Sequence, residues 1–226
     1  MALFDCTCDA KSGNARALTF TTAHGDFHTP MFMPVGTSAT VKGITPPQLR
    51  ELKSQVVLAN TYHLSQRPGE DVVAEAGGVH KFMNYDGPML TDSGGFQIFS
   101  LADTRKLDDD GVTFRSIYDG SYVRWTPEEN MRIQEALGAD IAMQLDQCPP
   151  YPATREFVER AVDLSAMWAR RCLAAHKRPD QTLFGIVQGG MNLDLRLESI
   201  RRLRESEDES LAAGGRRFGG FGIGGY

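Results

Sequence analysis

The fold is decided by the stretch Gly87-Pro88-Met89-Leu90-Thr91-Asp92-Ser93-Gly94-Gly95-Phe96-Gln97. An apolar run ends in the carboxylate of Asp92 and is followed at once by a turn of small residues. The two glycines allow backbone conformations that are closed to other residues and let a ligand approach closely, and Phe96 offers one aromatic face. Such a strand end suits a flat polar molecule. The simpler interpretation is a strand-to-helix turn, with Asp92 or Ser93 as the helix N-cap.

Length and composition indicate an ordinary soluble globular protein. The 226 residues suit one barrel-sized domain or two small ones. An apolar content of 41% and a charged content of 23% are typical of such proteins. The net charge of −5 gives no global polycation that would advertise nucleic-acid binding, although a local basic patch stays compatible with it.

The sequence predicts neither a membrane span nor a disulfide framework. No apolar run approaches the ~18 residues needed to cross a bilayer, and the N-terminus lacks a basic region followed by an apolar one, so we expect no signal peptide and a cytoplasmic protein. The pair Cys6 and Cys8 has no second Cys or His pair at zinc-finger spacing, which favours free thiols over a metal site. The four cysteines form no disulfide pattern for a chain of this size: Cys6, Cys8, Cys148 and Cys172.

The first half of the chain predicts an antiparallel start and then alternating strands and helices. Two β-rich segments flank a glycine turn, and Thr45-Pro46-Pro47 predicts a helix start with Thr45 as N-cap. Gly77-Gly78 is expected to stop a second helix. The predicted elements are strands at 17–22 and 27–35, a helix from 46, a strand at 55–60, a helix at 66–77 and a strand at 87–92.

The second half contains an insertion and then returns to the alternation. A charged turn is expected at 106–111, and Asp119-Gly120 is a strong hairpin signal between two alternating segments. Thr126-Pro127-Glu128-Glu129 predicts a capping box. The predicted elements are a β-hairpin at 112–125, a helix to Leu137, a strand at 139–146, a helix at 153–176, a strand at 182–190, a helix at 192–206 and a strand at 218–226.

Apolar strands that alternate with helices predict an α/β protein whose parallel sheet is covered on both faces. Five strands end in functional-looking groups, which in a (β/α)8 TIM barrel would converge on one mouth: Asn60, Asp92, Asp146, Gln188 and Gly224-Gly225. The rival doubly wound sheet usually carries a phosphate-binding glycine fingerprint after its first strand, and none is present. We therefore predict a TIM barrel with an inserted β-hairpin. Because a complete barrel needs about 250 residues, we expect this one to be incomplete at the C-terminus.

The groups at these strand ends would hold a purine-like base. A carboxylate accepts hydrogen bonds from ring N–H and amino groups, and an amide both donates and accepts. An aromatic face stacks on a base. Two carboxylates would also divide acid and base duties if their environments separate their pKa values. A sugar-cleaving carboxylate pair is the competing enzyme hypothesis.

Seven segments, found in order over nearly the whole chain, resemble the tRNA-guanine transglycosylase (queuine tRNA-ribosyltransferase) family. They are Pro30-Met31-Phe32-Met33-Pro34-Val35-Gly36-Thr37, Asn60-Thr61-Tyr62-His63-Leu64, Thr91-Asp92-Ser93-Gly94-Gly95-Phe96-Gln97, Gly111-Val112-Thr113-Phe114-Arg115-Ser116, Leu145-Asp146-Gln147-Cys148, Gly185-Ile186-Val187-Gln188-Gly189-Gly190 and Gly222-Ile223-Gly224-Gly225.

The resemblance implies a fold, a reaction and partners. The family adopts a (β/α)8 barrel with insertions and exchanges guanine at the wobble position of certain tRNA anticodons for a 7-deazaguanine, either a queuosine precursor or queuine. The reaction is a double displacement through a covalent ribosyl-enzyme intermediate, and the target base must leave its stack to reach the pocket. A structural zinc ion and a homodimer are expected of the full-length family.

The resemblance also assigns roles to individual residues. Asp92 matches the carboxylate that binds the base and serves as general acid/base, and Asp146 matches a second carboxylate that reads the base. Gln188 matches the amide that faces the base carbonyl, and Phe96 matches a ring that stacks on the base. The remaining matched pocket residues are Ser93, Gly94, Gly95, Cys148, Gly224, Gly225 and the backbone of Tyr226.

Two parts of the family pattern are missing from these residues. The nucleophilic aspartate and the zinc ligands, a C-x-C-x2-C run with a distant His, lie beyond the matched segments, so residues 1–226 are expected to form a partial domain without nucleophile or metal site. We expect such a fragment to be inactive on tRNA. Two alternatives stay open: a non-catalytic subunit paired with an active homologue, and a glycosidase-like barrel. The basic clusters Arg105-Lys106, Arg170-Arg171 and Lys177-Arg178 are interpreted as solvated helix ends.

Overall fold

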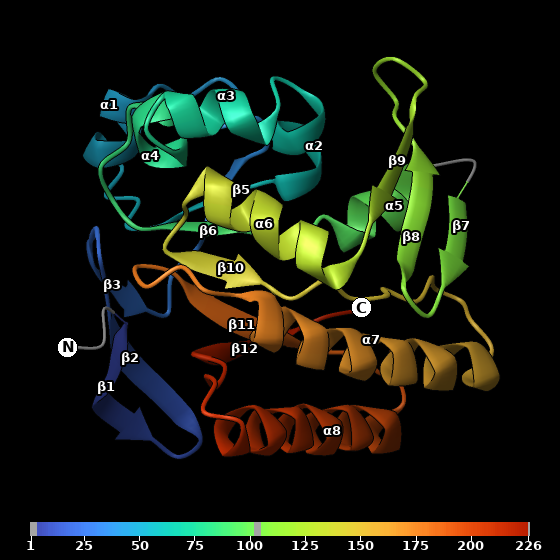
Figure 1. Cartoon of the computed structure of the whole chain (residues 1–226). Coiled ribbons are helices and arrows are strands. Elements are labelled where there is room, and N and C mark those ends of the chain that lie inside the picture. The colour runs from blue at the N-terminus through green and yellow to red at the C-terminus, as the bar shows by residue number, and fades with distance from the viewer. Residues whose placement is uncertain (1–3, 102–104, 226) are drawn as a thin grey trace. The chain divides into compact units, whose positions relative to one another are not determined.

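The computed structural model describes residues 4–101 and 105–225 and shows strands and helices in alternation (Figure 1). The chain divides into two compact units, and the boundary passes through α6, β10 and β11. The first unit comprises Met1–Asp92, Gln134–Ala142 and Arg178–Thr182, and the second comprises Ser93–Ile133, Met143–Lys177 and Leu183–Tyr226.

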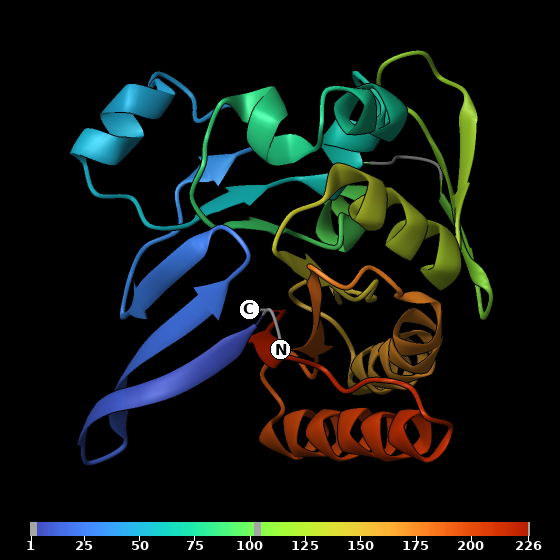
Figure 2. The same ribbon diagram turned by 60° about the vertical axis from the view of Figure 1, so that its left-hand side comes forward.

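The first unit opens with antiparallel strands, as predicted, which form the twisted blue ribbon of Figure 2. The strand predicted at 27–35 is confirmed only to Thr29, and Val35 belongs instead to the parallel sheet. Strands β1 (Asp5–Ser12), β2 (Ala15–Thr22) and β3 (Gly25–Thr29) form one sheet in the order β1-β2-β3. The rings of Phe20 and Phe27 stack across β2 and β3 with centroids 4.9 Å apart. Strand β1 was not predicted, because all of its residues are exposed and an exposed strand shows no apolar alternation.

Parallel strands form the centre of the first unit. Their order is β4-β5-β6-β10, which comprises β4 (Val35–Gly36), β5 (Val57–Ala59), β6 (Met89–Thr91) and β10 (Ile141–Met143). Leu58 is in register with Leu90, and Ala142 with Thr91. Side chains on both faces of the central strands β6 and β10 are buried, as expected of a covered parallel sheet.

Four short helices belong to the first unit: α1 (Pro46–Glu51), α2 (Thr61–Gln66), α3 (Glu70–Glu75) and α4 (Val79–Met83). Thr45 is the N-cap of α1, as predicted, and forms a capping box with Gln48. The single helix predicted at 66–77 is wrong. Pro68 lacks an N–H and disfavours helical geometry at Arg67, so α2 ends at Gln66 and the chain re-enters a helix only at Glu70.

The carboxylate of Asp140 ties four segments of the first unit together. Its Oδ1 accepts hydrogen bonds from Nδ1 of His24 (2.8 Å) and from the His24 backbone N–H (3.2 Å). Its Oδ2 accepts from Nε2 of His80 (3.0 Å) and the Met89 N–H (2.9 Å). The β2–β3 turn, α4, β6 and the start of β10 therefore share one buried acceptor. Burial opposes ionisation, but these hydrogen bonds outweigh it and lower the pKa of Asp140 to about 2.

We predict that Asp140→Asn destabilises the protein by about 2 kcal/mol at neutral pH, the free energy that corresponds to lowering a carboxyl pKa from 3.8 to about 2. Because the folded-state pKa is depressed, this stabilisation is present above pH ~4 and is lost as the pH falls through the folded pKa. Urea unfolding measured at several pH values tests it. A substituted protein whose stability falls between about pH 4 and pH 2 as steeply as that of the original chain would contradict the assignment.

The second unit contains a separate antiparallel sheet, the predicted insertion. Its order is β7-β8-β9, with β7 (Arg105–Asp108), β8 (Gly111–Arg115) and β9 (Tyr122–Trp125). The hairpin is confirmed, but part of the predicted charged turn is strand β7, and Arg105-Lys106 lies on that strand and not at a helix end. Phe114 and Trp125 pack edge to face on the buried side, with centroids 5.5 Å apart. Trp168 Nε1 donates to the Asp109 carbonyl (2.8 Å), which anchors the β7–β8 turn to α7.

Long helices and two parallel strands complete the second unit. Thr154 caps α7 by accepting from the Phe157 N–H. On α7, Ala161, Leu164, Trp168 and Cys172 are buried, whereas Phe157 is exposed. Helices α7 and α8 lie side by side (Figures 1 and 2). The elements are α5 (Gly95–Leu101), α6 (Pro127–Leu137), α7 (Arg155–Ala175), α8 (Leu193–Ala212), β11 (Thr182–Val187) and β12 (Gly220–Ile223).

The architecture is α/β with a parallel sheet, as predicted, but a closed barrel is not seen. Among residues 4–101 and 105–225, β4 pairs only with β5 and β12 only with β11. None of the helices in the described part of the chain is both long and apolar enough to cross a membrane.

Candidate functional site

In the first unit, Asp92 directly follows β6 and is held by the loop after β5. Asn60 Nδ2 donates to Oδ2 of Asp92 (2.6 Å), and the Thr61 N–H donates to Oδ1 (3.1 Å). The Thr61 hydroxyl donates to the Asp92 carbonyl (2.5 Å). Asn60 also caps α2, because its Oδ1 accepts from the His63 N–H. The sequence marked Asn60 as a polar strand end but did not reveal that it orients Asp92.

In the second unit, the carboxylate of Asp146 lies at the centre of a buried polar cluster. Ser93 Oγ donates to Oδ1 of Asp146 (2.8 Å), and Gln188 Nε2 donates to Oδ2 (2.5 Å). The Ser93 oxygen also accepts from the Gly95 N–H at the start of α5 (3.1 Å). The Gly94 carbonyl accepts the first hydrogen bond of α5, from the Ile98 N–H (3.2 Å), so Gly94 is the N-cap and the prediction of Asp92 or Ser93 in that position is wrong. The Ser93 hydroxyl instead connects the turn before α5 to the cluster. Residues separated by 42 to 53 positions in the chain meet here.

Burial sets the protonation behaviour of this cluster. Desolvation raises the pKa of Asp146, opposed by the hydrogen bonds from Ser93 and Gln188. Desolvation, together with the charge of Asp146, raises the pKa of Cys148 to about 11. Cys148 is therefore a neutral thiol at physiological pH and is poorly suited to act as a nucleophile.

One atom of the cluster lacks a partner and thus points to a ligand. Gln188 is buried, and its Oε1 accepts no hydrogen bond within the described residues. A buried polar atom without a partner costs about 1–3 kcal/mol, so an N–H group from a ligand would be favourable there.

Glycines allow the chain to approach this cluster. A Cβ atom at Gly225 would lie 2.4 Å from Gln188 Oε1, and one at Gly224 would lie 2.8 Å from Gln188 Nε2. A Cβ at Gly95 would lie 2.9 Å from Asp146 Oδ1. Any side chain at these positions would displace the amide or the carboxylate.

Three supporting residues escaped the sequence analysis. Asn130 is fully buried and donates to the Ser93 carbonyl (2.8 Å), and Ser199 accepts from the Gln188 N–H (3.1 Å). Arg196 donates to the carbonyls of Val187, Gly190 and Gly225 at 3.3, 2.8 and 3.2 Å. A helix residue therefore holds the ends of β11 and β12. No sequence motif marks these three residues, because each one contacts a distant segment of the chain or backbone atoms, whose partners do not depend on residue type.

The structure brings together most, but not all, of the predicted site residues. The second unit gathers Ser93, Gly95, Asp146, Cys148, Gln188, Gly224 and Gly225. Gly94 takes the left-handed backbone conformation expected of the turn, with φ of 72°. Phe96 lies on α5 with 62% of its surface exposed. Asp92 belongs to the first unit, and Tyr226 lies outside the described residues.

The residues present do not fit the zinc site implied by the family resemblance. Cys6 and Cys8 are exposed free thiols on β1. Within the described segments, the only group that could bind a metal ion is His24, His80 and Asp140. Its rings stack with centroids 3.6 Å apart and already donate to the carboxylate, and it contains no thiol.

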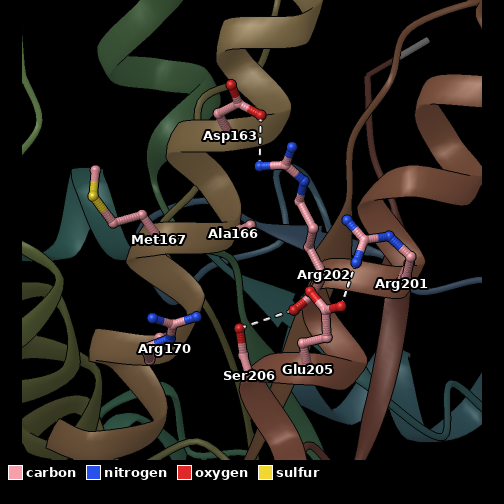
Figure 3. Close-up of a pocket in the computed structure, with 8 residues that line it drawn as sticks. All are labelled: Asp163, Ala166, Met167, Arg170, Arg201, Arg202, Glu205 and Ser206. Atoms are coloured by element: carbon pink, nitrogen blue, oxygen red, sulfur yellow. Dashed lines mark hydrogen bonds and ion pairs between the residues drawn. The ribbon is translucent and has the colours of Figure 1, made fainter. Parts of the chain in front are cut away.

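The basic cluster on α7 is neutralised by ion pairs. Figure 3 shows a cavity between α7 and α8 lined by both kinds of charge. Arg170 pairs with Glu209 (2.7 Å), and Arg202 pairs with Asp163 (2.7 Å). Further pairs connect Arg201 with Glu205, Arg171 with Glu128 and Arg178 with Asp180. The arginines interpreted as solvated helix ends are thus at least partly exposed and ion-paired, and this cavity offers no surplus charge to a ligand.

The fold and the cluster around Asp146 define a class of protein, the parallel α/β proteins with a polar site at the ends of their strands. The sequence model of the family described as "Queuine tRNA-ribosyltransferase" matches residues 9–226, and the chain belongs to this family.

Curated relatives carry the same name. A queuine tRNA-ribosyltransferase of Synechococcus elongatus is 57% identical over 212 residues, covering 93% of this chain and 55% of the relative. One of Gloeobacter violaceus is 56% identical, covering 95% and 57%, and one of Staphylococcus aureus is 51% identical, covering 92% and 55%. The chain thus spans a little over half the length of these relatives.

We predict that Asp146→Asn increases the stability of the protein at neutral pH. Because burial raises the folded-state pKa of Asp146, its ionisation disfavours folding as the pH rises above the usual carboxyl range. Denaturant unfolding should show a gain for Asp146→Asn that grows with pH, whereas Asp140→Asn should show a loss. A loss of stability from both substitutions would contradict the assigned electrostatics.

Proposed function

We propose that this chain is part of an enzyme that replaces the wobble guanine of target tRNA anticodons with a 7-deazaguanine. Family membership supports the reaction, and the buried cluster around Asp146 supports the binding of a base. The observation that carries the proposal is the buried, unpartnered Oε1 of Gln188 beside the carboxylate of Asp146.

Guanine fits these groups by its edges. Its N1–H and amino group are two adjacent donors, one for the carboxylate of Asp146 and one for the unpartnered Oε1 of Gln188. Adenine lacks the carbonyl and places a lone pair at N1, facing the carboxylate. Asp146 and Gln188 would thus select guanine-type bases, and Phe96 would stack on the ring.

Asp92 would handle the proton in this proposal. When the bond between ribose and guanine breaks, the leaving base needs a proton, and the incoming 7-deazaguanine must lose one. Asn60 and Thr61 hold the Asp92 carboxylate with hydrogen bonds, which fixes its position without neutralising it.

The nucleophile of the proposed double displacement is not among the residues discussed above. The resemblance assigns it to an aspartate beyond the matched segments, whose carboxylate would form a bond to the ribose as the bond to the base breaks. We also propose that the parallel sheet is part of a (β/α)8 barrel, and that the full-length protein is a homodimer with a structural zinc ion. A chain of residues 1–226 alone is then expected to bind the base but not to exchange it.

Calorimetric titration of this chain with guanine and adenine tests the proposal. We expect guanine to bind and adenine not to bind, and Gln188→Ala to weaken guanine binding at least about ten-fold through the lost amide contacts. The matched control is Asn14→Ala, which removes an exposed amide from the turn between β1 and β2.

Three results would contradict parts of the proposal. Equal affinity for guanine and adenine would refute base selection, and release of sugar from a simple glycoside would favour the glycosidase alternative. Incorporation of labelled guanine into tRNA by this chain would refute the assignment of the nucleophile to another segment.

A further inference from the structure

The strands β7, β8 and β9 present two chemically different faces. Along β8, Val112 and Phe114 are buried, whereas Arg115 is exposed. Successive residues of a strand point to opposite faces, and β9 follows the same alternation, with Trp125 buried and Arg124 exposed. The buried face packs within the second unit, and the other faces solvent.

The pairing of the strands gathers the outward side chains in two rows. Thr113 lies opposite Lys106 of β7 and Arg124 of β9. Arg115 lies opposite Tyr122. Residues that face each other in this way have Cβ atoms about 5 Å apart, so the side chains of Arg115 and Tyr122 leave the sheet at neighbouring positions. These five residues are called the outer sheet face.

The outer sheet face is basic although the whole chain carries a net charge of −5. Arg124 pairs with Asp108 (2.6 Å). Lys106 and Arg115 have no carboxylate partner within residues 4–101 and 105–225. Arg115 Nε donates to the Gly120 carbonyl (2.8 Å), which fixes the side chain and leaves its other N–H groups for a ligand. The cavity between α7 and α8 differs, since its arginines are paired with carboxylates (Figure 3).

Tyr122 adds an aromatic platform to these cations. Its side chain is 74% exposed, and Ile117 and Tyr118 in the adjoining turn are exposed as well. Figure 1 shows this turn extending beyond the ends of β8 and β9. A large ring left in water between cations has no role in the packing of the protein.

We propose that the outer sheet face binds single-stranded RNA, with Tyr122 stacking on a base and Lys106 and Arg115 contacting phosphates. Single-stranded nucleic acid is bound where a basic surface follows the backbone and an aromatic ring accepts a base in a sequence-tolerant way. In a duplex the bases are already stacked on one another, so only unpaired nucleotides can use the ring. This inference rests on the proposed function in taking RNA as the polymer, and it places a second contact outside the base pocket.

Fluorescence anisotropy with a labelled oligouridine tests the surface, because an oligomer without guanine does not engage the proposed pocket. We expect Tyr122→Ala to weaken binding about ten-fold and Tyr122→Phe to retain it. Lys106→Gln and Arg115→Gln should each lower the slope of log affinity against log salt by roughly 0.7. The matched control is Phe32→Ala, which removes an 80% exposed ring from the first unit and should leave binding unchanged.

The outcomes separate this inference from the proposed function. Oligouridine binding that does not depend on Tyr122, or that is lost equally in Phe32→Ala, would overturn the inference, as would equal binding of heparin and oligouridine. Calorimetry with guanine on Tyr122→Ala should show unchanged affinity. If the original chain binds oligouridine through Tyr122 but does not bind guanine, the proposed function fails and the RNA surface holds. Circular dichroism confirms that each variant is folded.

Discussion

The candidate site depends on one buried carboxylate, that of Asp146, which is kept inside the protein by the hydroxyl of Ser93 and the amide of Gln188. A buried carboxylate is tolerated only when hydrogen bonds replace its lost hydration. Meeting that requirement brings the turn after β6, the segment after β10 and the end of β11 to one point. The glycines beside this point are required by the same packing, because a side chain there would displace the amide or the carboxylate.

Two buried aspartates show how environment gives one residue type opposite properties. Asp140 accepts hydrogen bonds from two imidazoles and two backbone N–H groups, and its pKa falls. Asp146 is completely buried but accepts fewer hydrogen bonds than Asp140, so desolvation dominates and its pKa rises. The first is an anchor of the fold. The second carries a free-energy cost, because its hydrogen bonds do not fully replace the hydration lost on burial.

Much of this arrangement could be predicted from the sequence, because strand ends and glycine turns are local signals. Asp92, Asp146 and Gln188 each follow an apolar strand, and Thr45 and the Asp119-Gly120 hairpin carry clear signatures. The prediction of one helix at 66–77 was wrong because it followed the apolar periodicity and did not take into account that Pro68 interrupts a helix. Strand β1, Asn130 and Arg196 could not be predicted, since an exposed strand has no apolar period and contacts to distant backbone atoms leave no spacing in the chain.

Arg196 lies on α8, yet it holds three carbonyls at the ends of β11 and β12. The separation of these two strand ends is therefore governed by a residue that contributes no side chain to the cluster around Asp146. The dimensions of the site and the chemistry of its lining are thus encoded in different elements. A change in α8 would therefore alter the spacing of these strand ends while every residue that lines the cluster stays the same.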